Sequence, residues 1–156
     1  MRIIVPFLGK TREQYLVAGI EDFAGRLQRF AELSLPLLKE KKRPAKENPT
    51  RFALEDGQIL RASVPATARM VALTPEGEQL SSEGLAGLLG RWEDCGIREV
   101  AFLIGGPCGL PPELVREADF ALSLSRMTFT HEMARLLLLE QLYRAFSIRA
   151  GTGYHK

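Results

Sequence analysis

Residues 100–110 read V-A-F-L-I-G-G-P-C-G-L, and the fold can be inferred outward from this stretch. Its first half is a run of apolar residues that ends abruptly at two glycines and a proline. A short apolar run bounded in this way is typical of a strand buried on both faces, most often in a parallel sheet. The turn after such a strand lies at the carboxyl edge of the sheet, where open α/β sheets bind ligands.

The glycine spacing in this turn argues against a phosphate-binding loop. Gly105, Gly106 and Gly109 do not form the G-x-G-x-x-G pattern of dinucleotide-binding turns, and the chain contains no G-x-x-x-x-G-K-[ST]. Pro107 lacks the amide N–H that would donate to a pyrophosphate. Two interpretations stay open: a site for a flat, uncharged group held by backbone atoms, and a plain tight turn.

The composition is that of an ordinary globular protein. The 156 residues are 46% hydrophobic and 26% charged, and they predict one domain spanning residues 1–156. A net charge of +2 permits an RNA partner without indicating one. The only two cysteines, Cys95 and Cys108, are expected to be free thiols in a reducing compartment. Without a signal peptide or an apolar stretch of roughly 20 residues, we expect a cytoplasmic location and no membrane partner.

Predicted strands and helices alternate along the chain, which indicates an α/β fold with a mainly parallel sheet. The predicted strands cover residues 2–8, 31–38, 69–73, 100–104 and 120–124. The predicted helices cover residues 12–30, 50–63 with an interruption at Gly57, 82–95, 112–118 and 131–148. Thr11 and Thr130 are expected to cap the first and last helices, and Pro36 predicts an edge position for the second strand. The pattern alone favours an unknotted sheet, because knots are very rare.

Two segments suggest partners. The last predicted helix is apolar on more than one face, which is typical of burial in a large core or in a subunit interface, and the small chain favours a homodimer. Residues 39–48 read K-E-K-K-R-P-A-K-E-N. The cations Lys41, Lys42, Arg43 and Lys46 in this segment could contact phosphate, and a solvated charged loop is the alternative.

Four segments together resemble a known family. They are F-L-I-G-G-P-C-G-L at 102–110, L-S-L-S-R-M-T-F-T-H-E-M-A-R at 122–135, E-Q-L-Y-R-A-F-S-I at 140–148 and the terminal Y-H-K. The chain resembles the ribosomal RNA large subunit methyltransferase H family, the YbeA-like branch of the SPOUT methyltransferases, over its whole length. The resemblance implies a homodimer and an α/β domain with a deep C-terminal trefoil knot, in contrast to the expectation from the pattern.

The resemblance also implies an activity. As a member of that family, the chain would transfer a methyl group from S-adenosylmethionine to N3 of pseudouridine 1915 in 23S ribosomal RNA, on assembled ribosomes. By position, the implied cofactor-binding residues are Leu73, Gly105, Leu124, Ser125, Arg126, Met127, Thr128 and Phe129. Tyr154 and His155 match the terminal residues that approach the acceptor base, and we take them as the catalytic residues. Cys108 departs from the usual Glu and Gly153 from the usual Pro, which predicts an altered charge near the cofactor and a looser tail.

The chemistry of this reaction requires positioning and a base, because an imide nitrogen is a poor nucleophile while it is protonated. His155 is a candidate base, and Tyr154 could orient the acceptor. His131 is the other candidate, because the dipole of the last helix would keep it neutral, and a capping role is its alternative.

We assign His131 and Arg135 as substrate-binding residues. Arg135 and Arg144 could bind phosphate or the cofactor carboxylate, or form ion pairs within the protein. The activated donor needs no metal, and the scattered His and Cys residues lack the spacing of zinc ligands.

Two other functions stay open: another knotted RNA methyltransferase that acts on a ribose hydroxyl or a different base, and a nucleotide-binding module without catalysis. The terminal Tyr-His-Lys favours the enzyme.

Overall fold

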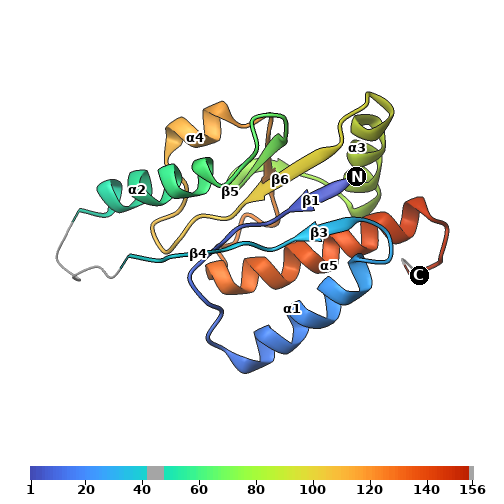
Figure 1. Ribbon diagram of the computed structural model, residues 1–156, viewed down its shortest axis with the longest axis horizontal. Helices are drawn as coiled ribbons and strands as arrows, with labels where there is room; N and C mark the ends of the chain where they lie inside the picture. The colour runs from blue at the N-terminus through green and yellow to red at the C-terminus, as the bar shows by residue number, and fades with distance from the viewer. Residues whose placement is uncertain (42–47, 155–156) are drawn as a thin grey trace.

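A parallel sheet lies between two groups of helices in the computed structural model, which describes residues 1–41 and 48–154 (Figure 1). Its strands follow the order β3-β1-β6-β5-β7, and each strand runs parallel to its neighbours. The strands are β1 (Arg2–Ile4), β3 (Glu32–Ser34), β5 (Arg69–Gln79), β6 (Glu99–Leu103) and β7 (Phe120–Ser123). This arrangement confirms the α/β class with a mainly parallel sheet.

The central strand β6 has a hydrophobic core on each of its faces. Val100 and Phe102 belong to one core and Ala101 and Leu103 to the other, because successive side chains of a strand point to opposite faces. The first core is covered by α1 (Gln14–Leu27), α3 (Ser82–Asp94) and α5 (His131–Arg149). The second core is covered by α2 (Pro49–Ala62) and α4 (Pro112–Glu117), which lie on the opposite side of the sheet (Figure 1).

Prolines divide two of the predicted strands. The expected strand 2–8 is β1 followed, after Pro6, by β2 (Phe7–Leu8), and the expected strand 31–38 is β3 followed, after Pro36, by β4 (Leu37–Leu38). β2 and β4 pair in a separate two-stranded parallel sheet. Proline cannot donate a hydrogen bond to the strand ladder, so both segments of the chain leave the main sheet at Pro6 and Pro36. β3 is an edge strand, as Pro36 indicated.

Three other predicted boundaries were wrong. Helix α1 begins at Gln14 without a side-chain cap, because the Thr11 hydroxyl accepts a hydrogen bond from Arg135 at 2.9 Å. Gly57 does not interrupt α2. β5 continues past Thr74-Pro75 to Gln79, but its register against β7 shifts between Leu73 and Glu78, so residues 74–77 leave the ladder.

Helix α5 is apolar on several faces because it packs inside the first core, between α1 and α3. Leu138, Leu139 and Leu142 are completely buried within this one chain. Thr130 caps the helix as expected, accepting the Met133 amide at 3.1 Å. Core packing therefore accounts for much of the signal that suggested an interface, and both the homodimer and the knot stay predictions. None of the described helices is long and apolar enough to cross a membrane.

The burial of α5 predicts the effect of truncating its leucines. Leu138→Ala removes a fully buried side chain and should lower the free energy of unfolding by roughly 3 to 5 kcal/mol, because it leaves a cavity in the core. Leu54→Ala in α2, where the side chain is 41% exposed, is the control and should cost less than about 1 kcal/mol. Urea unfolding measures both, and equal costs would contradict the burial assigned to α5.

Candidate functional site

A cavity of about 490 Å³ opens at the carboxyl ends of β6 and β7, beside the register shift in β5. Its walls come from β5 where the register shifts, from the turn after β6, from the loop after β7 and from the first turn of α5. The lining residues are Leu73, Thr74, Pro75, Ile104, Gly105, Gly106, Pro107, Gly109, Leu124, Ser125, Met127, Thr128, Phe129, Thr130, His131 and Ala134. Only His131 among them can carry a charge, so the cavity suits a ligand held by apolar and backbone groups.

The turn after β6 is packed so tightly that its first glycine has no room for a side chain. The Gly109 amide donates to the Gly106 carbonyl at 2.9 Å, and Gly109 has a φ of 76°, which favours glycine. A Cβ on Gly105 would lie 2.4 Å from the Gly109 carbonyl carbon. A side chain at Gly105 would therefore displace the turn backbone rather than simply project into the cavity.

The loop after β7 is shaped by its own side chains. Ser123 donates to the Ser125 carbonyl at 3.0 Å, and the Ser125 hydroxyl accepts the Met127 amide at 3.0 Å. Met127 and Phe129 are 76% and 39% exposed, which places uncovered apolar groups at the cavity. Large exposed hydrophobic groups beside a cavity are typical of a binding surface.

Most of the predicted cofactor-binding residues line this one cavity. They are Leu73, Gly105, Leu124, Ser125, Met127, Thr128 and Phe129. The exception is Arg126, which is exposed and donates to the Pro75 carbonyl at 3.1 Å. Arg126 thus ties the loop after β7 to residues 74–77.

Sequence reasoning missed Thr74 and Pro75 as lining residues because it treated them only as a strand end. Their position after an apolar strand was the available signal, since the carboxyl ends of parallel strands meet at one edge of the sheet.

The two predicted substrate-binding residues differ in their surroundings. His131 lines the cavity and is half-buried, and desolvation followed by the Arg135 cation lowers its pKa below the ordinary value of 6.5. It is therefore neutral at neutral pH, as expected, but the main cause is burial and not the helix dipole. Arg135 is only 2% exposed and donates to the Leu8 carbonyl at 2.6 Å and to Thr11. Its guanidinium also lies over the Phe7 ring, with the Cζ atom 4.6 Å from the ring centroid.

These contacts show how Arg135 is held. Its guanidinium is buried, forms hydrogen bonds to the β2–α1 connection and is not among the residues that line the cavity, so a role in substrate binding stays a prediction. The neighbouring Glu132 has a similar role, because its carboxylate accepts the Arg12 amide at 2.9 Å and the Glu13 amide at 3.4 Å. Glu132 thereby supplies the N-terminal cap that α1 lacks in its own sequence.

The C-terminal tail lies at the other end of α5 from the cavity (Figure 1). The Tyr154 ring packs on Tyr143 at a centroid distance of 4.5 Å, and Arg144 lies over it at 5.0 Å. Arg144 also pairs with Glu140 at 2.6 Å, which supports the ion-pair interpretation of this residue. At about 1.5 Å of rise per residue, Arg144 lies about 20 Å along the helix from His131. His155, the other predicted catalytic residue, lies outside the described residues.

Comparisons with known proteins agree with this fold and cavity. Residues 1–155 match the family described as "Predicted SPOUT methyltransferase". The chain belongs to the SPOUT methyltransferase family. It is also 47% identical to "Ribosomal RNA large subunit methyltransferase H" of Desulfotalea psychrophila and 42% identical to the protein of that name in Moorella thermoacetica, each over 100% of this chain. The matches cover 100% and 99% of those relatives.

The fold of this SPOUT methyltransferase also occurs in a solved structure. The probable methyltransferase from Bordetella pertussis Tohama I superposes with a TM-score of 0.56 at 16% identity, covering 93% of this chain and 95% of that one. The family match and the full-length relatives show that the protein is a methyltransferase and confirm the family inferred from the sequence.

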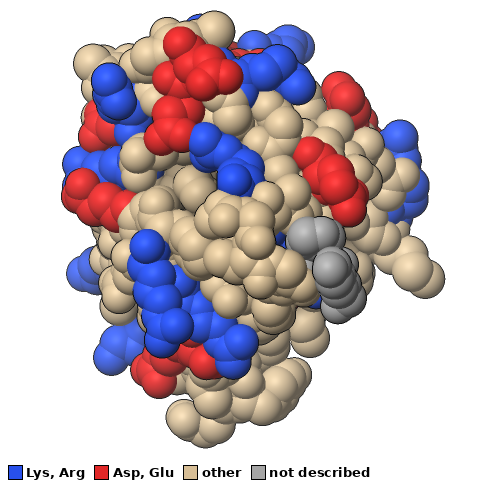
Figure 2. All heavy atoms as spheres, turned by 90° about the vertical axis from the view of Figure 1, so that its right-hand side faces the viewer, with Lys and Arg blue, Asp and Glu red and all other residues tan. Residues whose placement is uncertain are grey.

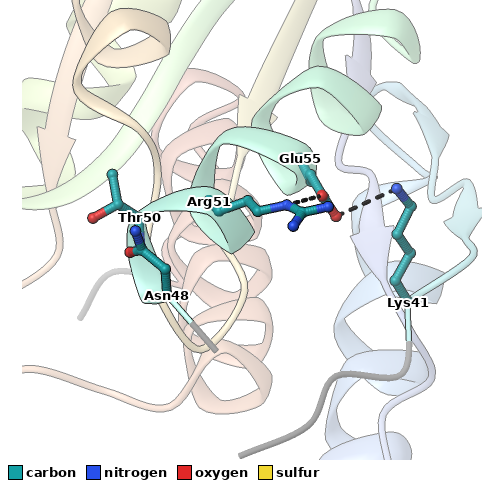
Figure 3. Close-up of polar contacts among 5 residues, drawn as sticks. All are labelled: Lys41, Asn48, Thr50, Arg51 and Glu55. Atoms are coloured by element: carbon teal, nitrogen blue, oxygen red, sulfur yellow. Dashed lines mark hydrogen bonds and ion pairs between the residues drawn. The ribbon is translucent and has the colours of Figure 1, made fainter. Parts of the chain in front are cut away.

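The basic segment of the SPOUT methyltransferase is partly described. Lys42, Arg43 and Lys46 lie outside the described residues. On the near side of that gap, Lys41 pairs with Glu55 at 3.3 Å, and Glu55 also holds Arg51 at 3.1 Å (Figure 3). On the far side, Asn48 caps α2 by accepting the Thr50 amide at 3.0 Å. The charge of Lys41 is therefore balanced by α2 in this structure.

Side chains that favour metals do not gather in the described part of the SPOUT methyltransferase. No group of three or more His, Cys, Asp or Glu residues that could hold a metal ion occurs within residues 1–41 and 48–154. Cys95 and Cys108 are both exposed free thiols, as expected.

The environment of His131 predicts a pH dependence of stability. Because folding lowers its pKa, the unfolded chain binds more protons below about pH 6.5, and stability is lost as the pH falls from there toward the lower folded-state pKa. His131→Gln should remove this loss. The difference in free energy of unfolding between wild type and variant should change between about pH 7 and pH 5, in favour of the variant at low pH. Parallel curves in urea titrations would contradict the assigned pKa.

Proposed function

We propose that this methyltransferase transfers the methyl group of S-adenosylmethionine to N3 of a pseudouridine in 23S ribosomal RNA, at the position known as 1915, on assembled ribosomes. The observation that carries the proposal is the uncharged cavity between the turn after β6 and the loop after β7. The names of the full-length relatives, which are large-subunit ribosomal RNA methyltransferases, support RNA as the substrate. We place the reaction in the cytoplasm, with the ribosomes.

The cavity fits the cofactor in size and in chemistry. Its volume of about 490 Å³ lies within the range of small-molecule sites. Leu73, Leu124 and Phe129 offer apolar surface for an adenine ring, and the Gly105–Gly109 turn allows close backbone approach. When bound, the sulfonium supplies an already activated methyl group. The residues of the chain therefore need to position the donor and acceptor and to accept a proton.

Two groups are available to accept the proton from the acceptor nitrogen. His131 lies in the cavity wall with a lowered pKa, so its neutral ring can accept a proton or a hydrogen bond. His155, next to Tyr154 in the sequence, is the other. We assign the proton transfer to the terminal Tyr154-His155 pair, with Tyr154 orienting the base and His131 contacting the substrate.

The distance from the tail to the cavity implies a second copy of the chain. Tyr154 packs beside Tyr143 and Arg144, about 20 Å along α5 from the cavity of its own chain. We infer that the enzyme works as a homodimer in which the tail of one copy closes the cavity of the other. In a two-fold dimer this exchange is reciprocal, so both sites are completed in the same way.

Specificity for one nucleotide is expected to come from shape more than from charge. The net charge is only +2, and Figure 2 shows acidic and basic side chains interspersed on the face that lies on the right in Figure 1. A mixed surface of this kind gives a weak, non-selective attraction to phosphate. Recognition of the folded ribosomal surface by the dimer is therefore the favoured source of selectivity.

The cofactor proposal is tested by titrating S-adenosylmethionine into the purified protein by calorimetry. Gly105→Ala should abolish binding, because its Cβ would lie 2.4 Å from the backbone of Gly109. Gly25→Ala is the matched control, since nothing lies within 4 Å of the added carbon, and it should bind like wild type. Unchanged affinity in a folded Gly105→Ala protein would exclude this cavity as the cofactor site.

The reaction is tested by mass spectrometry of ribosomal RNA from cells that lack the gene. N3-methylated pseudouridine should disappear from 23S ribosomal RNA and return when the wild-type protein is supplied. Loss of a ribose methyl group instead would identify a different knotted RNA methyltransferase, and an unchanged spectrum would favour a binding module.

The shared site is tested by mixing two inactive variants. Co-expressed Gly105→Ala and Tyr154→Ala chains should recover about a quarter of wild-type methyl transfer, because half of the dimers are mixed and each has one complete site. Each variant alone should be nearly inactive while remaining dimeric in sedimentation. No recovery in isolated mixed dimers would show that the tail serves its own chain.

A further inference from the structure

A buried acidic side chain lies behind the turn that forms the cavity wall. Asp56, in the middle of α2, is only 3% exposed. A Cβ added to Gly106 would lie 2.6 Å from the Asp56 Oδ2 atom, so this carboxylate oxygen occupies the space that a side chain at Gly106 would need. Gly106 lines the cavity, whereas Asp56 does not, which places the carboxylate behind the turn.

The neighbouring residue brings the same part of α2 close to the far end of the turn. A Cβ added to Gly57 would lie 2.4 Å from the Pro111 Cγ atom. Gly57 therefore allows α2 to contact the chain just after Leu110. This contact explains why a glycine is found in the interior of a helix, where it costs about 1 kcal/mol relative to alanine.

The buried carboxylate of Asp56 has an interaction partner, so its position in α2 is held. An alanine at position 56 would leave a gap behind Gly106. The Gly105–Gly109 turn is closed by a hydrogen bond within itself, from the Gly109 amide to the Gly106 carbonyl. The nearest atoms on the Cβ side of Gly106 belong to Asp56 and, next, to the Leu8 side chain, so these two side chains support the turn from behind.

We propose that Asp56 is a positioning residue for the cofactor site. Its carboxylate packs against Gly106 and thereby holds the Gly105–Gly109 turn in the position, relative to the sheet, that leaves the cavity open to the adenosine and methionine parts of the cofactor. The inference rests on the proposed function for the identity of the ligand, but the contact itself belongs to the free protein. Asp56 touches neither the ligand nor the reacting atoms, so it acts through the position of the turn.

The test combines two substitutions, one that removes the Asp56 carboxylate and one that adds a methyl group at Gly106 in the same space. Asp56→Ala removes the oxygen and should raise the dissociation constant for S-adenosylmethionine about tenfold, and Gly106→Ala should do the same by adding a clash. In the double variant the new methyl group fills the gap left by the oxygen. Its affinity should therefore exceed that of Gly106→Ala by about fivefold, as measured by calorimetry.

Gly105→Ala is the matched control for this exchange. The atoms nearest its added Cβ are all backbone atoms of Gly109 and Leu110, so Asp56→Ala should not improve its binding. If Asp56→Ala acted only by destabilising the protein, it would not improve cofactor binding in Gly106→Ala while leaving binding in Gly105→Ala unchanged. If Asp56→Ala fails to fold, Asp56→Ser, which also shortens the side chain, takes its place in both pairs.

Backbone amide chemical shifts of the free protein provide a readout that needs no cofactor. The amides of Gly105, Gly106 and Gly109 should shift in Asp56→Ala and move back toward their wild-type positions in the double variant. Unshifted turn amides, unchanged affinity in Asp56→Ala, or equal rescue of both glycine variants would overturn the role of Asp56. Wild-type protein that fails to bind S-adenosylmethionine would instead overturn the proposed function.

Discussion

The burial of β6 on both faces is the constraint on which the rest of the structure depends. Residues Val100 to Leu103 are at most 1% exposed, so helices must cover the sheet on both sides of this strand. The alternation of its side chains between two cores determines which helices lie on each face. Because its neighbours β1 and β5 run parallel to it, their carboxyl ends meet at the edge where the glycine turn begins.

The first turn of α5 links this edge to the rest of the chain. Within five residues it places His131 in the cavity wall, Glu132 on the N-terminus of α1 and Arg135 on the Leu8 carbonyl. The same turn of helix therefore provides a titratable group for the site and fixes the β2–α1 connection. A substitution at Arg135 is expected to affect the site through structure, since it would leave the buried Leu8 carbonyl and the Thr11 hydroxyl without this donor, and unpaired buried polar groups are costly.

Close packing of backbone against backbone is the second feature of the site. Gly105 packs on Gly109, and Gly77 packs on the Ala121 carbonyl oxygen, at distances that no Cβ could share. Three chain segments can therefore approach one another around a cavity of about 490 Å³ without side chains filling it. The wall of the cavity consists of backbone groups and largely apolar side chains, which suits an uncharged ring better than a phosphate.

Much of the fold and part of the site could be predicted from the sequence. The apolar run that ends at Gly105 indicated a buried parallel strand followed by a turn at the carboxyl edge of the sheet, because burial on both faces removes the polar alternation. The segments around Gly105 and residues 124–129 identified the family. The divided strands were less predictable. Pro6 and Pro36 show where each strand leaves the main sheet, but not that the two segments after them pair with each other.

Only the tertiary structure decided the roles that depend on neighbours distant in the chain. The sequence left open whether Arg135 binds a phosphate, binds the cofactor carboxylate or forms ion pairs, and its environment is set by Leu8 and Thr11, more than 120 positions away. Asp56 lies in an ordinary amphipathic helix, and nothing local indicates that Gly106 rests on it. The sequence by itself determined which segments form strands, turns and a cofactor-like motif, because these follow from local pattern. Which side chains face the cavity and which support it from behind is set by packing between segments, and local pattern carries no information about that.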